Sequence, residues 1–150
     1  MFWDRHGLIF TYPVPKGTTV TGKAYANVLK TGLIPAIAQS RPHLANGFIL
    51  HQDNAPPHRA LLVKDVLKDH NIEVLPHPPY SPDLAPSDFW LFPKMKDELR
   101  GRHFPSRAAL GSAIFQYGKR AAEDFFLDAY RQWVYRWDKC ILKEGDYVEK

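Results

Sequence analysis

Two aspartates stand in positions where a carboxylate can serve a binding site. Asp53 directly follows a short apolar run, residues 47–52, which is typical of a buried strand. Open α/β sheets bind their ligands at the carboxyl ends of such strands. Asp88 opens a helical pattern after a proline-rich loop, where the helix dipole and unpaired N–H groups stabilise a negative charge. Both aspartates are therefore candidate site residues.

Each aspartate also fits a purely structural role. Taken alone, Asp88 is better explained as a carboxylate at the start of a helix, and Asp53 could be only a turn residue before the next helix. His51 alternates with Asp53, so both side chains should point to the same face of the sheet. His51 could orient the carboxylate or simply pack, and packing is the favoured interpretation.

Further histidines lie near the two aspartates in the sequence: His58, His70 and His77. The chain has one cysteine, Cys140, and lacks the His-x-x-x-His spacing of a helical metal site. A structural zinc site is therefore disfavoured, and Cys140 is expected to be a small buried hydrophobe. Asn54 could shape the site or cap the following helix.

The first half of the chain predicts the elements that would position Asp53. Residues 2–3 and 7–14 indicate a hairpin with a short first arm, and a weak helical pattern covers residues 23–30. A strand over residues 47–52, a helix from Pro56 to His70 and a strand over residues 72–75 then follow. This order favours a parallel, right-handed crossover unit.

The second half predicts the surroundings of Asp88. Residues 76–86 form a proline-rich loop, Ser87 is expected to cap the following helix, and Pro93 is expected to break or restart it. Two longer helices end the chain. The last carries a stripe at helical spacing that indicates core more strongly than base stacking: Phe126, Tyr130, Trp133, Trp137, Cys140 and Ile141.

Composition limits the class of protein. A chain of 150 residues with 45% hydrophobic and 24% charged residues is typical of one globular domain. The net charge of +4 favours a polyanionic partner without requiring one. A basic run follows Asp88 and would be a solvated face or, as a second interpretation, a phosphate contact: Lys94, Lys96, Arg100, Arg102 and His103. The sequence contains no apolar run long enough to cross a membrane.

Read together, the segments resemble a known family. The blocks HQDNAPPH (51–58) and VLPHPPYSPDLAPSDFWLFPKMK (74–96) are similar to the two signature blocks of mariner-type transposases, in the Tc1/mariner superfamily. The 34 residues between Asp53 and Asp88 match the spacing of that family's second and third catalytic aspartates. FWDRHG at the start, GRHF at 101–104, and RWDKCI through GDYVE at 136–149 also resemble the family, in the same order.

The resemblance implies an α/β, ribonuclease-H-like fold with a mixed sheet flanked by helices. Asp53 and Asp88 would each bind divalent metal, as two of three carboxylates that hold two Mg²⁺ ions, with Mn²⁺ as a substitute. The implied reaction is cut-and-paste transposition, meaning cleavage of DNA at the transposon ends and transfer of the strands to target DNA. The implied setting is the nucleus, with a possible homodimer.

The chain departs from the family at its start. The family's first catalytic aspartate belongs to a central first strand upstream of FWDRHG, and Asp4 cannot replace it because it falls in the turn after the second strand. We therefore expect residues 1–150 to be a single truncated catalytic domain, a fragment inactive by itself, which leaves open whether the chain is an enzyme. The alternative is a domesticated, non-catalytic domain that binds DNA or protein.

Overall fold

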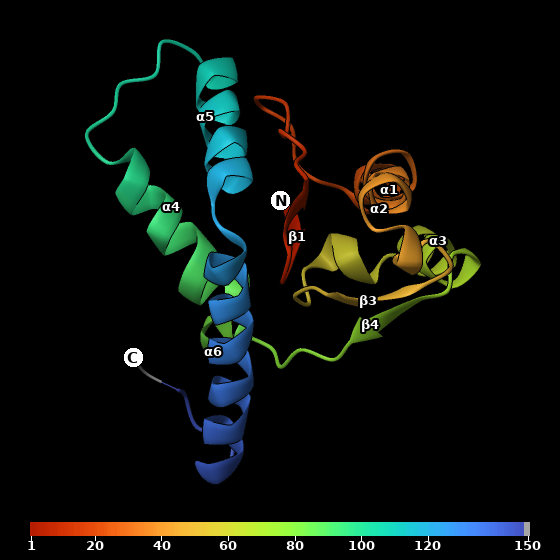
Figure 1. The fold of residues 1–150 in the computed structure, drawn as a ribbon. Helices are drawn as coiled ribbons and strands as arrows, with labels where there is room; N and C mark the ends of the chain where they lie inside the picture. Colours follow the sequence, from red (N-terminus) through yellow and green to blue (C-terminus); the bar gives the residue numbers. More distant parts are fainter. Residues whose placement is uncertain (149–150) are drawn as a thin grey trace. The chain divides into compact units, whose positions relative to one another are not determined.

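The computed structural model describes residues 1–148, and these form two compact units (Figure 1). The first unit comprises Met1–Phe2 and Ile9–Pro79, and the second comprises Trp3–Leu8 and the chain from Tyr80 onward. Glu149, which ends the GDYVE segment, lies outside the described residues. Each unit is built around its own buried side chains, so each is described separately.

The predicted hairpin is present and contributes residues to both units. Strand β1 (Phe2–Asp4) pairs with β2 (Gly7–Phe10), which confirms the short first arm. The second arm ends at Phe10 and not at residue 14 as predicted. Pro13 and Pro15 lack the backbone N–H that a longer ladder needs, which explains the early end.

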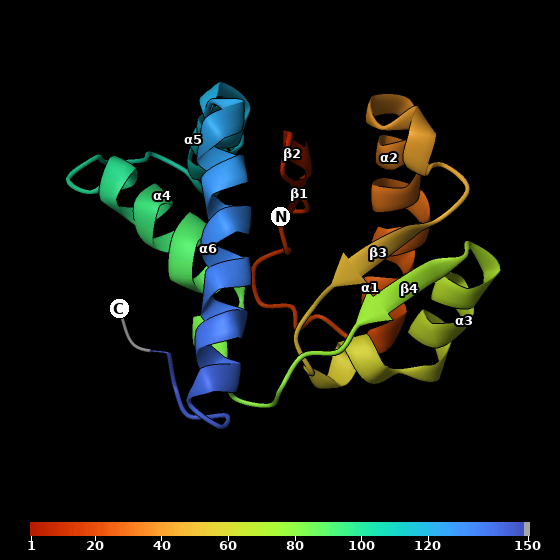
Figure 2. The same ribbon diagram turned by 60° about the horizontal axis from the view of Figure 1, so that its bottom comes forward.

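The first unit contains the predicted crossover. Strands β3 (Phe48–His51) and β4 (Ile72–Leu75) pair in parallel, with Phe48 opposite Ile72 and His51 opposite Leu75. Helix α3 (Leu61–Asp69) connects them, and Figure 2 shows the two strands side by side. The parallel arrangement is confirmed, and it brings the carboxyl ends of both strands to the same edge.

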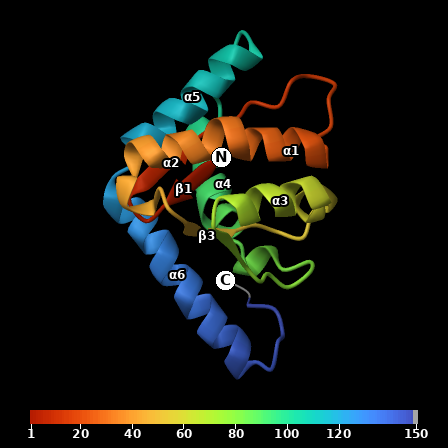
Figure 3. The ribbon, with the colours of Figure 1, turned by 90° about the vertical axis from the view of Figure 1, so that its right-hand side faces the viewer.

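A long helical segment precedes β3. It consists of α1 (Gly22–Val28), a wider π-helical turn (Leu29–Leu33) and α2 (Ile34–Ser40), which Figure 3 shows as one continuous run. Thr21 begins it by accepting a hydrogen bond from the backbone N–H of Ala24, at 3.1 Å. The predicted helix over residues 23–30 was therefore too short at its C-terminal end.

The core of the first unit lies between the β3–β4 pair and the helices α1 and α3. Leu29, Leu33 and Val63 are at most 1% exposed, and Leu50 and Ile72 contribute from the strands. Ile49, which alternates with Leu50 along β3, is 64% exposed. One face of the strand pair therefore packs on the core and the other faces solvent, which fixes the register and orientation of β3 up to its C-terminal end.

The helix predicted from Pro56 to His70 is divided. A short 3₁₀ turn, η3 (Pro56–Arg59), is separated from α3 by Ala60, whose backbone is extended. Gly22 approaches this point so closely that a Cβ on it would lie 2.4 Å from the Cβ of Ala60. The division matters because it places His58 on a separate turn, next to the end of β3.

The second unit is helical. It contains the 3₁₀ turn η4 (Pro82–Leu84), the π-helical turn η5 (Ser87–Leu91) and α4 (Phe92–Leu99). Helices α5 (Arg107–Arg120) and α6 (Glu123–Leu142) complete it, separated by the extended residues Ala121 and Ala122. The large side chains buried most deeply in this unit are Leu84, Leu91, Phe126 and Val148.

One prediction about the start of the Asp88 helix was wrong. Ser87 lies inside the first turn and does not cap it, because its hydroxyl accepts a hydrogen bond from the indole of Trp3, at 3.1 Å. Pro93 was expected to break or restart the helix, and the restart is confirmed, because η5 ends at Leu91 and α4 begins at Phe92. Pro93 lies in the first turn of α4, where a missing N–H costs little, and the backbone stays helical through Leu91 and Phe92.

The apolar stripe of α6 is only partly core. Phe126 is fully buried and Trp133 is half-buried, whereas Tyr130 is 46% exposed and Ile141 is 71% exposed. Cys140 is half-buried, so the expectation of a buried cysteine was wrong. The stripe is therefore buried at Phe126, near the start of α6, and exposed at Ile141, near its end. None of the helices described over residues 1–148 is long and apolar enough to cross a membrane.

Candidate active site

Asp53 lies two residues beyond β3, at the carboxyl edge of the parallel pair. Its side chain is 59% exposed, and its Oδ1 accepts a hydrogen bond from the backbone N–H of Ala55, at 3.0 Å. That bond is the turn role expected from the sequence. The same residue therefore shapes a turn and presents a carboxylate to solvent, so the two interpretations are compatible.

His58 holds the Asp53 carboxylate from the side. Its Nδ1 lies 2.7 Å from Asp53 Oδ1 and 3.1 Å from the backbone oxygen of Asp53. The imidazole stacks on the ring of Tyr25, with 4.3 Å between centroids. The Tyr25 hydroxyl in turn donates to Gln52 Oε1, at 2.7 Å. These contacts restrict the rotation of His58 and, through it, that of the carboxylate.

Tyr25 was not identified from the sequence as a site residue. Burial raises the pKa of Tyr25, and the negative charge of Asp53 raises it further, so the hydroxyl stays protonated and able to donate. Tyr25 belongs to α1 and contacts residues about 30 positions later in the chain. No local pattern in the sequence signals such a contact.

Two other histidines meet behind the edge. His51 Nε2 lies 3.1 Å from His77 Nδ1. Burial and, to a smaller extent, the neighbouring His77 lower the pKa of His51 to about 4, against the opposing effect of the Asp53 charge. His51 is thus neutral at pH 7 and packed against a second imidazole, as the favoured packing interpretation expected. Asn54 donates to the backbone oxygen of His77, at 2.6 Å, and so ties together the loops that follow the two strands.

Asp88 is exposed in the first turn of η5, in the second unit. Its backbone N–H donates to the oxygen of Ala85, at 2.8 Å, which fixes the start of the turn. Asp88 also lines a cavity of about 530 Å³. The other lining residues are Pro82, Asp83, Phe89, Arg136, Tyr147 and Val148. Asp88 is therefore both a residue of a helix start and part of the wall of a cavity.

The two carboxylates differ in their surroundings but are both open to a metal ion. Asp53 belongs to the first unit and Asp88 to the second, and both are accessible to an ion. Among residues 1–148, no three His, Cys, Asp or Glu side chains cluster closely enough to hold a metal. Hard carboxylate oxygens suit Mg²⁺ or Mn²⁺, and the cavity beside Asp88 is also lined by the carboxylate of Asp83, whose Oδ2 accepts from the backbone N–H of Val148. The donor chemistry fits a divalent ion, and the remaining ligands must come from elsewhere.

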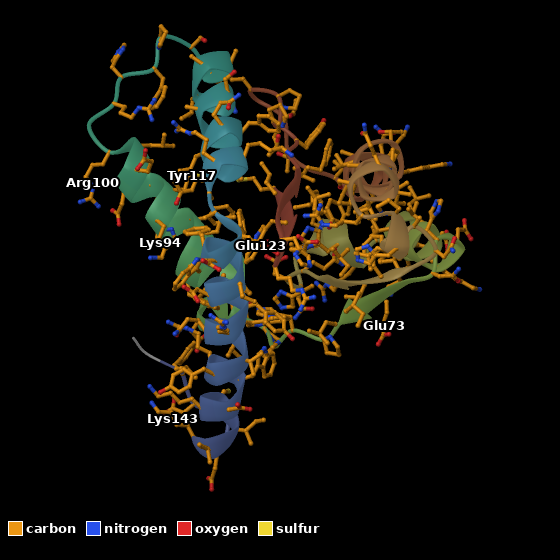
Figure 4. The ribbon with its side chains drawn as sticks, viewed as in Figure 1. Glu73, Lys94, Arg100, Tyr117, Glu123 and Lys143 are labelled. Carbon is orange, nitrogen blue, oxygen red and sulfur yellow. The ribbon has the colours of Figure 1, made fainter. Side chains whose placement is uncertain are left out.

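The basic run after Asp88 is exposed throughout. Lys94 and Arg100 project from α4 in Figure 4. Lys94 lies 4.3 Å from the ring centroid of Trp90, and Arg100 pairs with Asp97 at 2.5 Å. Arg102 and His103 follow in the exposed loop after α4. The run forms an accessible basic surface beside the turn that carries Asp88.

Comparison with known proteins connects this arrangement to a family. The DDE superfamily endonuclease family matches residues 12–111. The chain is 34% identical over 152 residues to the mariner Mos1 transposase of Drosophila mauritiana, covering 99% of this chain and 44% of that protein. It is 32% identical to the human histone-lysine N-methyltransferase SETMAR, of which it covers 22%. The chain thus spans less than half of either relative.

Solved structures show the same relationship. The Mos1 catalytic domain solved with raltegravir and Mg is 35% identical, with a TM-score of 0.92 over 98% of this chain and 74% of that one. The Mos1 paired-end complex with the left transposon end gives a TM-score of 0.91 over 98% of this chain and 43% of that one. These matches confirm the predicted ribonuclease-H-like fold and the mariner resemblance. The chain therefore belongs to the DDE superfamily endonucleases and is a homologue of the Mos1 mariner transposase.

Proposed function

We propose that Asp53 and Asp88 are two of the carboxylates with which a mariner-like transposase binds divalent metal for DNA strand cleavage and transfer. The observation that carries this proposal is the geometry at Asp53. An exposed carboxylate stands at the carboxyl edge of a parallel strand pair and is held in one orientation by His58, whose Nδ1 lies 2.7 Å from Oδ1. Asp88 lies in the second signature block, is exposed and lines a cavity.

The chain's own residues would prepare this site before an ion arrives. Ala55 and His58 hold Oδ1 of Asp53, and Tyr25 holds His58. The carboxylate therefore loses little rotational freedom when it binds an ion. Bound Mg²⁺ or Mn²⁺ would activate an oxygen nucleophile and stabilise the leaving oxygen, and two ions would do both. The Mos1 catalytic domain has been solved with Mg and with Mn, which supports the choice of ion.

The substrate we propose is DNA, both transposon ends and target. Mos1 structures include a paired-end complex with the left transposon end and a strand transfer complex. The exposed residues Lys94, Lys96 and Arg100 would contact phosphate beside the Asp88 turn. Because the proposed substrate is DNA, we propose that the protein acts in the nucleus. We also propose that it assembles as a homodimer on paired transposon ends.

We propose that the 150 residues alone cannot complete the reaction. Two-metal chemistry requires a third carboxylate, which the resemblance places before the hairpin. The test is nicking of supercoiled plasmid in Mg²⁺ or Mn²⁺ by the purified chain. We expect none from a folded sample. Nicking that disappears in Asp53→Asn and Asp88→Asn, and persists in the exposed α3 variant Asp65→Asn, would contradict the inactivity while supporting the two ligands.

Metal binding tests the two ligands without requiring activity. A titration with Mn²⁺, followed by the electron paramagnetic resonance signal of the free ion, should show weaker binding in Asp53→Asn and in Asp88→Asn. The matched controls Asp65→Asn on α3 and Asp138→Asn on α6 replace exposed carboxylates and should leave binding unchanged. Equal binding by all four variants and the unmodified chain would refute the proposal.

A second candidate is a domesticated domain that binds DNA without cleaving it. One observation favours it, namely that the chain is 32% identical to part of a protein named as a histone-lysine N-methyltransferase. This candidate predicts DNA affinity that falls steeply with salt, because Lys and Arg release counterions from phosphate. Replacing Lys94 and Lys96 by Gln should weaken binding, whereas Lys64→Gln on α3 should not. Absent or salt-independent binding would exclude this candidate.

A further inference from the structure

The loop of residues 80–86, which leads to Asp88, is held by α6 and by the C-terminal segment Tyr147–Val148. The indole of Trp133 donates to the oxygen of Leu84, at 2.8 Å. The hydroxyl of Tyr147 donates to the oxygen of Tyr80, at 3.1 Å. The loop therefore receives hydrogen bonds from two elements that lie about 50 and about 65 residues later in the chain. Its shape depends on them as well as on its prolines.

Arg136 joins these elements at one point. Its Nη1 donates to the backbone oxygens of Asp83 and Val148, at 3.1 Å each. Its guanidinium carbon lies 4.2 Å from the ring centroid of Phe89, the residue next to Asp88. One side chain thus contacts the loop before Asp88, the turn that carries it, and the C-terminal segment. We call these contacts the Arg136 clamp.

The clamp is closed by a reciprocal bond and is partly buried. The backbone N–H of Val148 donates to Asp83 Oδ2, at 2.8 Å. The side chains of Val148 and Leu84 are each 2% exposed, so these bonds lie beside apolar packing. Hydrogen bonds of this kind resist opening because a buried, unpaired carbonyl or N–H is costly. Both bonds of Arg136 leave one nitrogen, Nη1, while the planar guanidinium lies over the ring of Phe89, and an ammonium on a flexible stem does not reproduce that planar placement.

The clamp acts on the candidate ligand through the chain. Asp83 lies within η4, and the Asp88 N–H donates to the oxygen of Ala85, directly after η4, at 2.8 Å. The loop residues therefore set where η5 starts. Asp88, Phe89 and Arg136 also line the same cavity. Movement of the loop would therefore change the position from which the Asp88 carboxylate meets an ion.

We propose that Arg136 is a positioning residue for Asp88, and that the α6 helix and the segment Tyr147–Val148 serve the metal site through it. This inference rests on the proposed function, since it takes Asp88 as a metal ligand. Groups that orient a metal-binding side chain commonly change metal affinity about 10- to 100-fold when they are replaced. We therefore expect loss of the clamp to weaken Mn²⁺ binding at Asp88 about tenfold.

The test measures Mn²⁺ binding at Asp88 alone, in the whole 150-residue chain, from the broadening of its backbone amide signal in NMR spectra. The variants are Arg136→Gln and Arg136→Lys. Arg131→Gln is the matched control, because Arg131 is on the same helix, is 67% exposed and pairs with Asp128. Arg136→Lys keeps the charge but loses the planar guanidinium that lies over Phe89. It remains informative if Arg136→Gln does not fold.

We expect Arg136→Gln to lower both the melting temperature and the Mn²⁺ affinity at Asp88. Arg136→Lys should recover most of the melting temperature but not the Mn²⁺ affinity. Arg131→Gln should match the unmodified chain in both. A purely structural role would give recovery of both properties in Arg136→Lys. Full Mn²⁺ affinity at Asp88 in a folded Arg136→Lys chain therefore overturns the inference. If the unmodified chain shows no broadening at Asp88, the proposed function itself fails, which is a different result from failure of the clamp.

Discussion

The two compact units hold their candidate carboxylates by different means. Asp53 follows a buried strand and is held mainly by its own turn, by Ala55 and by His58 five residues later. Asp88 follows a loop whose shape is fixed by Trp133 and Arg136, from a helix about 50 residues away in sequence. The first position is set largely by local structure and the second by tertiary contacts. A change in distant packing should therefore disturb Asp88 more than Asp53.

The largest expected effect is the loss of the aromatic core of the second unit. Phe126 is fully buried and lies 5.5 Å from Trp3 and 5.1 Å from Phe125, between ring centroids. Phe126→Ala should lower the free energy of unfolding by about 3–5 kcal/mol, because it leaves a cavity that the helices cannot fill. Denaturant unfolding measures this loss. The half-exposed Phe115→Ala on α5 should cost far less, and equal costs would contradict the assignment of the core.

The next effect concerns the entry to β3 in the first unit. Gly47 has a φ of +143°, and a Cβ there would lie 2.7 Å from the backbone oxygen of Asn71. Gly47→Ala should destabilise the chain by about 2 kcal/mol, from backbone strain and from the displaced Asn71. Gly101→Ala is the control, since Gly101 has a φ of +75° but open space around it. Gly47→Ala should melt at a lower temperature than Gly101→Ala. Equal melting temperatures would show that the close approach of Gly47 to Asn71 does not matter for stability.

His58 tests the local mechanism at Asp53. His58→Asn should weaken Mn²⁺ binding at Asp53 about tenfold, because the carboxylate loses the partner that orients it. Broadening of the Asp53 amide signal by Mn²⁺ reports the change. His43→Asn, at an exposed position in the same unit, should have no effect. An unchanged affinity at Asp53 in His58→Asn would show that the contact with His58 does not prepare the site.

The smallest effect tests the long-range mechanism at Asp88. Trp133→Phe keeps an aromatic ring but removes the donor to the Leu84 oxygen, which should cost about 1 kcal/mol. Amide hydrogen exchange at Leu84 and Ala85 should become faster. Trp90→Phe removes a comparable bond, to the oxygen of Phe125, away from this loop. If both variants open the loop equally, the contact with Leu84 is not what holds it.

The same distinction explains what the sequence could predict. The strand over residues 72–75 was predicted with its observed bounds, and the strand before Asp53 within about one residue of each end, because apolar runs between turn formers are local signals. Asp53 and Asp88 were found from their settings and from the family blocks. Their structural roles as a turn residue and a helix-start residue were also expected, and both are observed.

The failures have a common physical cause. Ser87 was expected to cap a helix, but its hydroxyl accepts from Trp3, which lies 84 residues earlier in the chain. Arg136 carries no local pattern that distinguishes it from a solvated charge on α6, and only tertiary structure brings it to Asp83 and Val148. Tyr25 is an ordinary helix residue until α1 packs beside η3. Contacts across long separations decide these roles, and sequence periodicity does not report them.

The most direct test of the account is a map of Mn²⁺ broadening over all assigned amide signals of the unmodified chain. The account predicts that broadening is strongest around Asp53 and around Asp88, where carboxylates are exposed and positioned. The amide signals around other acidic residues, such as Asp65 on α3 and Asp138 on α6, should stay sharp. Broadening centred on those helices, with sharp signals at Asp53 and Asp88, would contradict the assignment of both metal ligands.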